Sequence, residues 1–170
     1  MQKDRFPVVL VLDNIRSLQN IGAIFRTAEA ANISKIYLTG ICGQPPRKEI
    51  TKASLGADGV LPWEYRKSPV DLITDLKKQG FFIVSAELSD RSVNFRKAQY
   101  KFPLALVMGH EREGVSSEIL NMSDLIVEIP MLGSHAKSLN VAVSCGIILY
   151  EIISTVIPVP KAFGMGIHVC

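Results

Sequence analysis

The chain has 170 residues, a length that suits one domain with a sizeable hydrophobic core. Hydrophobic residues make up 48% and charged residues 21%, an ordinary globular balance, and the net charge of +3 permits a polyanionic partner without arguing for one. The three cysteines, Cys42, Cys145 and Cys170, have no CxxC spacing and the three histidines share no ligand spacing, which excludes a disulfide framework and predicts no metal site.

Strands and helices alternate in the first part of the chain. Residues 7–12 form a continuous apolar run, typical of a strand buried on both faces. Apolar residues then follow helical spacing over 21–31, with Asn20 as the candidate N-cap and Asn32 as a residue that tolerates the left-handed position after a helix. The next predicted elements, a second strand, a Gly/Pro-rich loop and a brief third strand, are residues 35–39, 40–58 and 60–61.

The second part of the chain repeats this alternation. Ser68, Pro69 and Asp71 are a strong helix start, and the helix is predicted to run to Gln79 with Gly80 after its end. The remaining predicted elements are strands at 81–86, 104–108 and 125–129, an irregular segment at 87–103, a short helix capped by Ser116, and a long, largely buried helix from Ser138 to about Thr155. This order predicts an α/β fold, a mostly parallel sheet with helices on both faces.

We expect one domain over residues 1–157 and an irregular tail over 158–170, where two prolines and two glycines lie. The apolar run at the N-terminus is too short for a signal peptide. The apolar run near 141–157 is interrupted by Ser144 and Glu151, so no membrane span is expected and a cytoplasmic location follows.

Three loops that follow predicted strands carry unusual polar residues. They are residues 13–20, 109–114 and 130–138. Parallel sheets bind their ligands in loops at the carboxyl ends of strands, so the function is expected there.

The first loop leads into a helix that carries Asn20 and Arg26. Both side chains can reach one region from the same end of the sheet, and Gly22 lets another backbone approach closely. A capped helix with a surface arginine explains this motif equally well.

The other two loops place polar residues at turns and at a helix start. In the second loop Gly109 begins a tight turn around Glu111, where backbone N–H groups can bind a ligand's carboxylate or adenine edge, although many α/β turns share this pattern. In the third loop Ser138 is an adequate N-cap by itself. Asn140 stands inside an apolar helix start and needs a partner there.

Taken together, in this order and at these spacings, the loops resemble the three motifs of the SPOUT superfamily, and specifically of the TrmH family of RNA ribose 2′-O-methyltransferases. The resemblance covers about residues 8–153. The matching segments are NxGAxxRTA at 20–28, GxExxGVS at 109–116, IPMxG with SLNVAVS at 129–144, and TKASLGAD at 51–58, which is similar to the family's K-x-S-x-G-A segment.

The resemblance implies a fold and a methyl donor. Members carry a deep trefoil knot in the C-terminal part of the α/β domain and hold S-adenosylmethionine in a bent shape within the knot loops. By position, the donor contacts would fall near Gly109, Ile129 and Leu139 and be largely main-chain, which accounts for the missing GxGxxG motif. Members are homodimers with active sites where the two knots meet, and the apolar last helix suits such an interface as well as it suits burial in one core.

The catalytic set that the resemblance implies is Asn20, Arg26, Glu111, Ser138 and Asn140. Because a guanidinium stays protonated at neutral pH, we expect Arg26 to orient the RNA and stabilise charge rather than act as a base. Ser138 and Asn140 would bind the ribose hydroxyl or hold Arg26. Glu111 is expected to fix the loop or Asn20 rather than to abstract a proton.

RNA is the expected partner, tRNA or rRNA, through basic residues of the core surface, although scattered basic residues are also ordinary solvated surface. His110, at a position where relatives commonly have Asn or a small residue, is interpreted as tolerated variation. The basic residues of the expected RNA surface are Arg16, Arg47, Lys48, Lys52, Arg66, Lys67 and Arg112.

Three alternatives remain. The chain could be a SPOUT enzyme that methylates a base, or a non-catalytic RNA- or donor-binding module of the same fold. The third alternative is a generic nucleotide-binding protein, but the sequence contains no P-loop.

Overall fold

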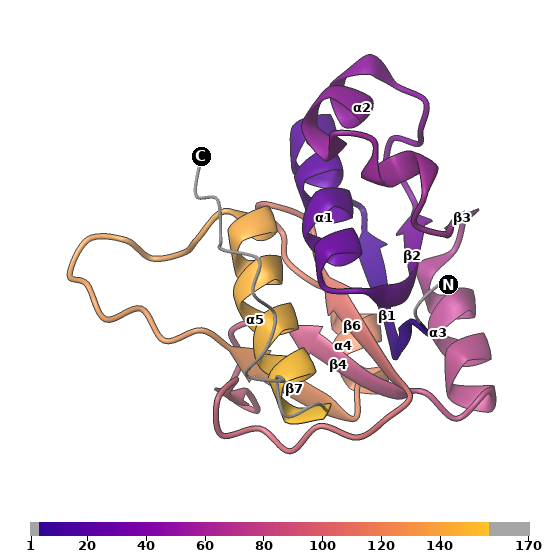
Figure 1. Cartoon of the computed structure of the whole chain (residues 1–170). Helices are drawn as coiled ribbons and strands as arrows, with labels where there is room; N and C mark the ends of the chain where they lie inside the picture. The colour runs from indigo at the N-terminus through magenta and orange to yellow at the C-terminus, as the bar shows by residue number, and fades with distance from the viewer. Residues whose placement is uncertain (1–3, 157–170) are drawn as a thin grey trace, which may run out of the picture.

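The computed structural model describes residues 4–156 and contains one parallel sheet (Figure 1). Within this range seven strands lie in the order β3-β2-β1-β6-β4-β7-β5, and each neighbouring pair is parallel. The predicted α/β fold is therefore confirmed. The strands are β1 Phe6–Asp13, β2 Ile33–Thr39, β3 Trp63–Arg66, β4 Phe82–Ala86, β5 Val93–Asn94, β6 Leu104–Met108 and β7 Leu125–Glu128.

Helices cover both faces of the sheet. The helices α1 and α5 pack together in one hydrophobic core, and α3 and α4 contribute to a second core on the other face. In β1, Leu10 points into the first core and Val11 into the second, which explains why this strand is apolar at every position. The helices are α1 Leu18–Ala30, α2 Lys48–Ser54, the 3-10 helix η1 Ala57–Gly59, α3 Pro69–Lys78, α4 Ser117–Met122 and α5 Val141–Val156.

Several predicted helix ends are confirmed by their capping bonds. Ser68 accepts a hydrogen bond from the backbone N–H of Asp71, and Gly80 has a left-handed φ of 84°. Ser116 caps α4, and Asn32 takes the left-handed conformation after α1 with a φ of 54°.

Other predicted boundaries are wrong. The N-cap of α1 is Ser17 rather than Asn20, because the Ser17 hydroxyl accepts the backbone N–H of Asn20 at 3.2 Å. The helix α5 begins at Val141 and not at Ser138, because the Asn140 side chain accepts the backbone N–H of Ala142 at 2.9 Å.

The segment between β2 and β3 also differs from the prediction. Residues 40–58 contain the helix α2, which was expected to be loop. The third strand is β3 at Trp63–Arg66, whereas residues 60–61 end the η1 turn, where the backbone N–H of Leu61 donates to Ala57.

The last helix, α5, is buried along only one side. Its described buried residues include Cys145 and Leu149, whereas Val143 and Tyr150 are each 52% exposed, so the expectation of a largely buried helix is corrected. No helix within residues 4–156 is long and apolar enough to cross a membrane. The predicted irregular tail, 158–170, lies outside the described residues.

Candidate functional site

The order of the strands reverses between β1 and β6, and the first two polar loops meet at this point. Leu12 is aligned with Met108, so both strands end at the same edge of the sheet. The loop after β1 and the loop after β6 leave this edge side by side, the usual position of a ligand site in a parallel sheet.

Glu111 joins these two loops. Its carboxylate accepts the backbone N–H of Arg16 at 3.1 Å, the backbone N–H of Ser17 at 3.0 Å and the side-chain amide of Asn20 at 3.2 Å. Partial burial acts to raise the pKa of Glu111, but the hydrogen bonds from Ser17, Arg16 and Asn20 outweigh it and the pKa is lowered. The carboxylate therefore lies at the start of α1, where free N–H groups favour negative charge.

Asn140 connects the third motif to the first. Its side-chain amide donates to the side-chain oxygen of Asn20 at 3.0 Å, while its own oxygen caps α5. Asn20 thus donates to Glu111 through its nitrogen and accepts from Asn140 through its oxygen. We call Asn20, Glu111 and Asn140 the amide–carboxylate cluster, and it joins residues up to 120 positions apart in the chain.

A cavity of about 700 Å³ adjoins this cluster, within the usual range for a small-molecule site. It lies at the carboxyl ends of β4, β6 and β7, and the base of the long loop between β7 and α5 forms one side of it. This loop projects from the body of the molecule in Figure 1. Each of the residues predicted to contact the donor lines it, as do two predicted catalytic residues. These lining residues are Gly109, Ile129, Leu139, Glu111 and Ser138.

The cavity suits a methyl donor of the predicted kind. Its lining carries three carboxylates and two basic side chains, which match a ligand with charges of both signs. These residues are Glu87, Glu111, Glu128, Arg112 and Lys137. A Cβ atom at Gly109 would collide with the backbone of Gly114 and Val115, so the turn beside the cavity can close only around a glycine.

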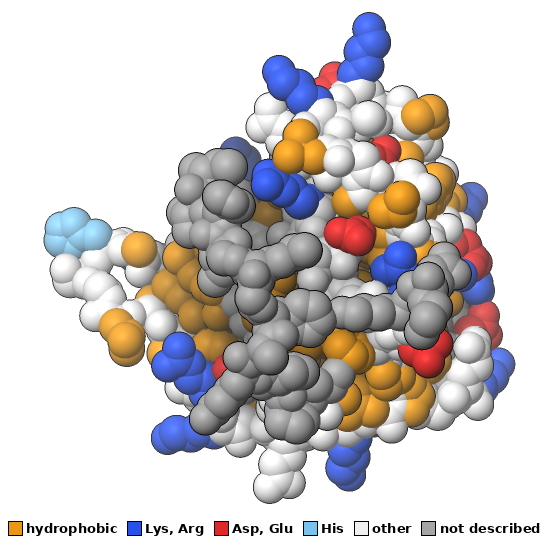
Figure 2. Space-filling model, in the orientation of Figure 1, with side chains coloured by type: hydrophobic (Ala, Val, Ile, Leu, Met, Phe, Trp, Pro, Cys, Tyr) orange, Lys and Arg blue, Asp and Glu red, His pale blue; other side chains and the backbone are white. Residues whose placement is uncertain are grey.

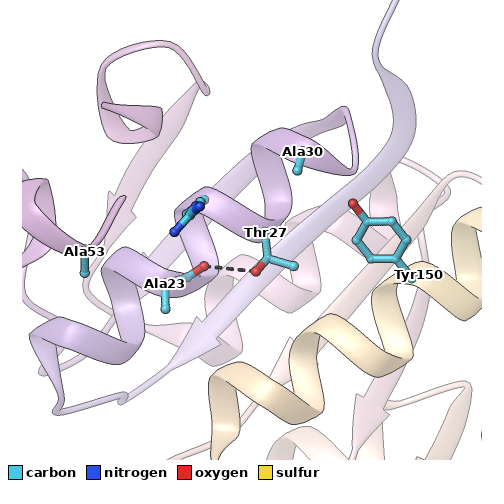
Figure 3. Close-up of a pocket in the computed structure, with 6 residues that line it drawn as sticks. Ala23, Thr27, Ala30, Ala53 and Tyr150 are labelled. Atoms are coloured by element: carbon cyan, nitrogen blue, oxygen red, sulfur yellow. Dashed lines mark hydrogen bonds between the residues drawn. The ribbon is translucent and has the colours of Figure 1, made fainter. Parts of the chain in front are cut away.

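Arg26 lies apart from the cluster. It is exposed on α1 and faces a shallow groove of about 380 Å³, where Thr27 from α1 and Tyr150 from α5 face one another and Ala53 of α2 forms a further wall (Figure 3). Among the described residues Arg26 makes no hydrogen bond to the cluster. The structure of one chain therefore joins Asn20, Glu111 and Asn140 by hydrogen bonds. Ser138 lines the cavity together with Glu111, and Arg26 lies in a separate groove.

Sequence reasoning missed residues that support the site from within. Asp13 at the end of β1 is only 2% exposed, and burial raises its pKa against hydrogen bonds from Asn14, Ser116 and Thr39. The signal in the sequence was the position of Asp13, a charged residue directly after the apolar run 7–12. Among residues 4–156 no group of three or more His, Cys, Asp or Glu side chains forms a candidate metal site.

Comparisons with known proteins identify the family of the chain. Residues 7–150 match the model of the SpoU rRNA Methylase family. A tRNA (guanosine(18)-2′-O)-methyltransferase of Aquifex aeolicus is 36% identical over 154 residues, which are 89% of this chain and 71% of that protein. The crystal structure of the A. aeolicus TrmH/SpoU tRNA modifying enzyme has a TM-score of 0.80 and 36% identity, and covers 89% of this chain and 76% of that one.

A second solved structure extends the comparison to a bound donor. The AdoMet-bound rRNA methyltransferase of Sinorhizobium meliloti has a TM-score of 0.82 and 32% identity, and the match covers 88% of this chain but 57% of that one. The chain thus spans little more than half of some relatives. The predicted reaction class, S-adenosylmethionine-dependent methylation of an RNA ribose, is confirmed, and the predicted knot is implied by the shared fold. This chain belongs to the SpoU rRNA methylase family, the TrmH-type enzymes whose motifs its three loops carry.

Proposed function

We propose that this chain, acting in the cytoplasm as a homodimer, methylates a ribose 2′-hydroxyl of tRNA. The observation that carries the proposal is the amide–carboxylate cluster, since it stands beside a donor-sized cavity and is assembled from all three motifs. The name of the Aquifex relative supports tRNA as the substrate.

Ser138 and Glu111, which both line the cavity, have different tasks in this proposal. S-adenosylmethionine, when bound, supplies a methyl group on a reactive sulfonium, so the chain has mainly to position the acceptor. Ser138 is exposed at the cavity and its hydroxyl is available to bind the ribose hydroxyl. Glu111 acts as an anchor and not as a base, because both of its oxygens already accept N–H groups from the start of α1.

A homodimer would complete the site with Arg26. The exposed apolar residues Val143, Ile147 and Tyr150 follow helical spacing along α5, an unusual stripe to leave in water. Tyr150 also borders the groove of Arg26, so a second copy seated on this stripe would bring its own cavity near that arginine. Figure 2 shows hydrophobic side chains gathered beside α5.

Complementation between two inactive variants tests this arrangement. Arg26→Ala and Asn20→Ala should each abolish transfer alone. If one subunit lends Arg26 to the other, the co-expressed pair should recover about a quarter of wild-type activity, since about half of the dimers are mixed and each mixed dimer has one intact site. Light scattering must show dimers in the mixture, and dimers without recovery would contradict the shared site.

The basic residues around α2 are the proposed RNA surface. Arg66 is removed from the expected set because it pairs with Asp75 at 2.7 Å. Arg47, Lys48 and Lys52 form no ion pair within the described part of the chain, and basic side chains stand out at the α2 end of the molecule in Figure 2. Unpaired charges remain available for phosphates.

Replacing the three α2 basic residues by Ala tests this surface. The triple variant should bind tRNA more weakly and lower the slope of log affinity against log salt by up to about 2–3, while donor affinity stays unchanged. The matched control removes three positive charges that are already paired, Lys35 with Glu64, Lys77 with Asp124 and Lys78 with Asp75. An equal effect of the control variant would contradict an RNA surface at α2.

The activity itself is tested with labelled donor and separate tRNA and rRNA pools from a strain without the gene, followed by nucleoside mapping. A 2′-O-methylated nucleoside in tRNA supports the proposal. A methylated base would favour a base-modifying enzyme. Donor binding without transfer to either pool would favour a non-catalytic module of the same fold.

A further inference from the structure

The loop Gly109–Val115 between β6 and α4 is held closed by a side chain of its own. Its backbone pairs with itself, since the N–H of His110 donates to Gly114 at 3.1 Å and the N–H of Gly114 donates back at 2.9 Å. Inside this closed turn, the Nδ1 atom of His110 accepts the backbone N–H groups of Arg112 and Glu113, both at 3.2 Å. The imidazole thus fills the turn that carries Glu111.

These two hydrogen bonds require one chemical form of the ring. A ring nitrogen that accepts an N–H must have a free lone pair, so the proton of the neutral imidazole lies on Nε2. When the ring takes up a second proton, Nδ1 becomes a donor and faces two donors. Both contacts of His110 with Arg112 and Glu113 are then lost.

The turn also has an outer support that does not depend on His110. Glu87, at the end of β4, accepts the backbone N–H of Val115 at 2.8 Å, and Gly114 adopts a φ of +70° next to the same carboxylate. The end of the loop is therefore anchored to the sheet. Between this anchor and β6, the backbone N–H groups of Arg112 and Glu113 are held by the His110 ring.

We propose that neutral His110 is a positioning residue for methyl transfer, because it fixes the turn that presents Glu111 to the start of α1 and borders the donor cavity. The inference rests on the proposed function and adds a residue to it. The titratable or charged groups around the ring are Asp13 at the end of β1, Glu87 directly after β4, and Glu111, Arg112 and Glu113 within the loop.

Two substitutions separate the acceptor role from mere packing. In His110→Asn, the shorter side-chain oxygen can still accept the N–H two residues ahead and does not titrate. In His110→Ala no acceptor remains. We expect His110→Ala to lower kcat/KM for tRNA about tenfold at about pH 8, and His110→Asn to stay within about threefold of wild type.

The pH profile is the readout that a purely structural role would not move. Protonation of the ring removes both acceptor contacts, so wild-type kcat/KM should fall relative to that of His110→Asn as the pH is lowered. An Asn variant with the same acid limb as wild type would overturn the proposal, and so would an Ala variant with wild-type activity.

Amide hydrogen exchange tests the same idea without any methyl transfer. The amides of Arg112 and Glu113 should be protected in wild type near pH 8, less protected relative to other amides near pH 5, and unprotected in His110→Ala. Unchanged relative protection in His110→Ala would overturn the role of the ring even if the substrate were not tRNA. If the amides behave as expected but the chain methylates no RNA, the role of the ring in the turn stands and only the proposed function is refuted.

Discussion

Removal of the Glu111 carboxylate tests whether the site depends on the contact between the first two motifs. Glu111→Ala deletes acceptors for the N–H groups of Arg16 and Ser17 and for the amide of Asn20, three bonds of 3.0–3.2 Å. A hydrogen bond contributes about 0.5–1.5 kcal/mol net, and water can replace the acceptor at this exposed position. We therefore expect the free energy of unfolding to fall by only about 1–2 kcal/mol, or about 2–8 °C in Tm.

The loss of activity should be much larger than the loss of stability. Without Glu111, the side chain of Asn20 keeps only its bond from Asn140, and the start of α1 is free to shift relative to the donor cavity. A misplacement of about 1 Å can cost about 100-fold in rate. Methyl transfer to tRNA with labelled donor should thus fall about 100-fold in kcat/KM, at a temperature where thermal unfolding shows the variant folded.

Glu113→Ala is the matched control, because Glu113 lies in the same loop, is exposed and forms no ion pair among the described residues. It should keep wild-type activity. If Glu111→Ala retained more than about a third of wild-type turnover, or if both variants lost activity equally, the cluster would not position the acceptor. The pKa of Glu111 is lowered in the folded chain, so its stabilising contribution is present above the ordinary glutamate pKa and is lost as the pH falls through the lowered value.

Three further predictions concern other parts of the chain. In Gly22→Ala the new Cβ would lie 2.5 Å from the carbonyl oxygen of Ile50 and 2.7 Å from the Cβ of Ala53, so chemical denaturation should show a loss of about 1–3 kcal/mol, and a loss under about 0.5 kcal/mol would contradict the close approach of α1 and α2. Because burial raises the pKa of Asp13, the folded chain holds a proton that the unfolded chain releases just above the ordinary aspartate pKa, and the free energy of unfolding falls as the pH rises across that window. Asp13→Asn should flatten this dependence, and an unchanged curve would refute it. Arg26→Ala should keep donor affinity in calorimetry but lose about 100-fold or more in transfer, and near wild-type turnover would remove Arg26 from the site.

Elements with strong local signals were predictable from the sequence. The strand β6 matches its predicted range because Pro103 and Gly109 limit the apolar run on both sides. The helix α3 starts where Ser68 and Pro69 predict it, since both residues act within one turn of the chain. Such short-range chemistry needs no knowledge of the rest of the fold.

The helix α2 was missed because its ends carry no such signals. Its N-cap is Arg47, which makes no capping bond through its side chain, and it ends at Leu55 in the left-handed conformation with a φ of 52°. Leucine rarely adopts this conformation, and glycine or asparagine is the usual residue there. The tertiary contact of α2 with Gly22 of α1, rather than its own sequence, fixes its place.

The residues of the site were predictable as a set, but their contacts were not. The motifs predicted that Asn20, Glu111 and Asn140 belong to one site. The local helix patterns, however, assigned the caps of α1 and α5 to Asn20 and Ser138, which is wrong. The capping bonds are local, from Asn20 to Ser17 and from Ala142 to Asn140. The contacts of Asn20 with Glu111 and with Asn140 join residues 91 and 120 positions apart, which local pattern reasoning does not reach. The isolation of Arg26 from the cluster likewise depends on how α1 is rotated against α5.

The cap of α1 explains how one asparagine can join all three motifs. If Asn20 were the N-cap, its oxygen would be occupied by a backbone N–H of the first turn and could not receive the amide of Asn140. Ser17 takes that position three residues earlier, so Asn20 lies within the first turn with both ends of its side chain free. One end then meets Glu111 and the other meets Asn140, which makes a local choice of cap the condition for a long-range site.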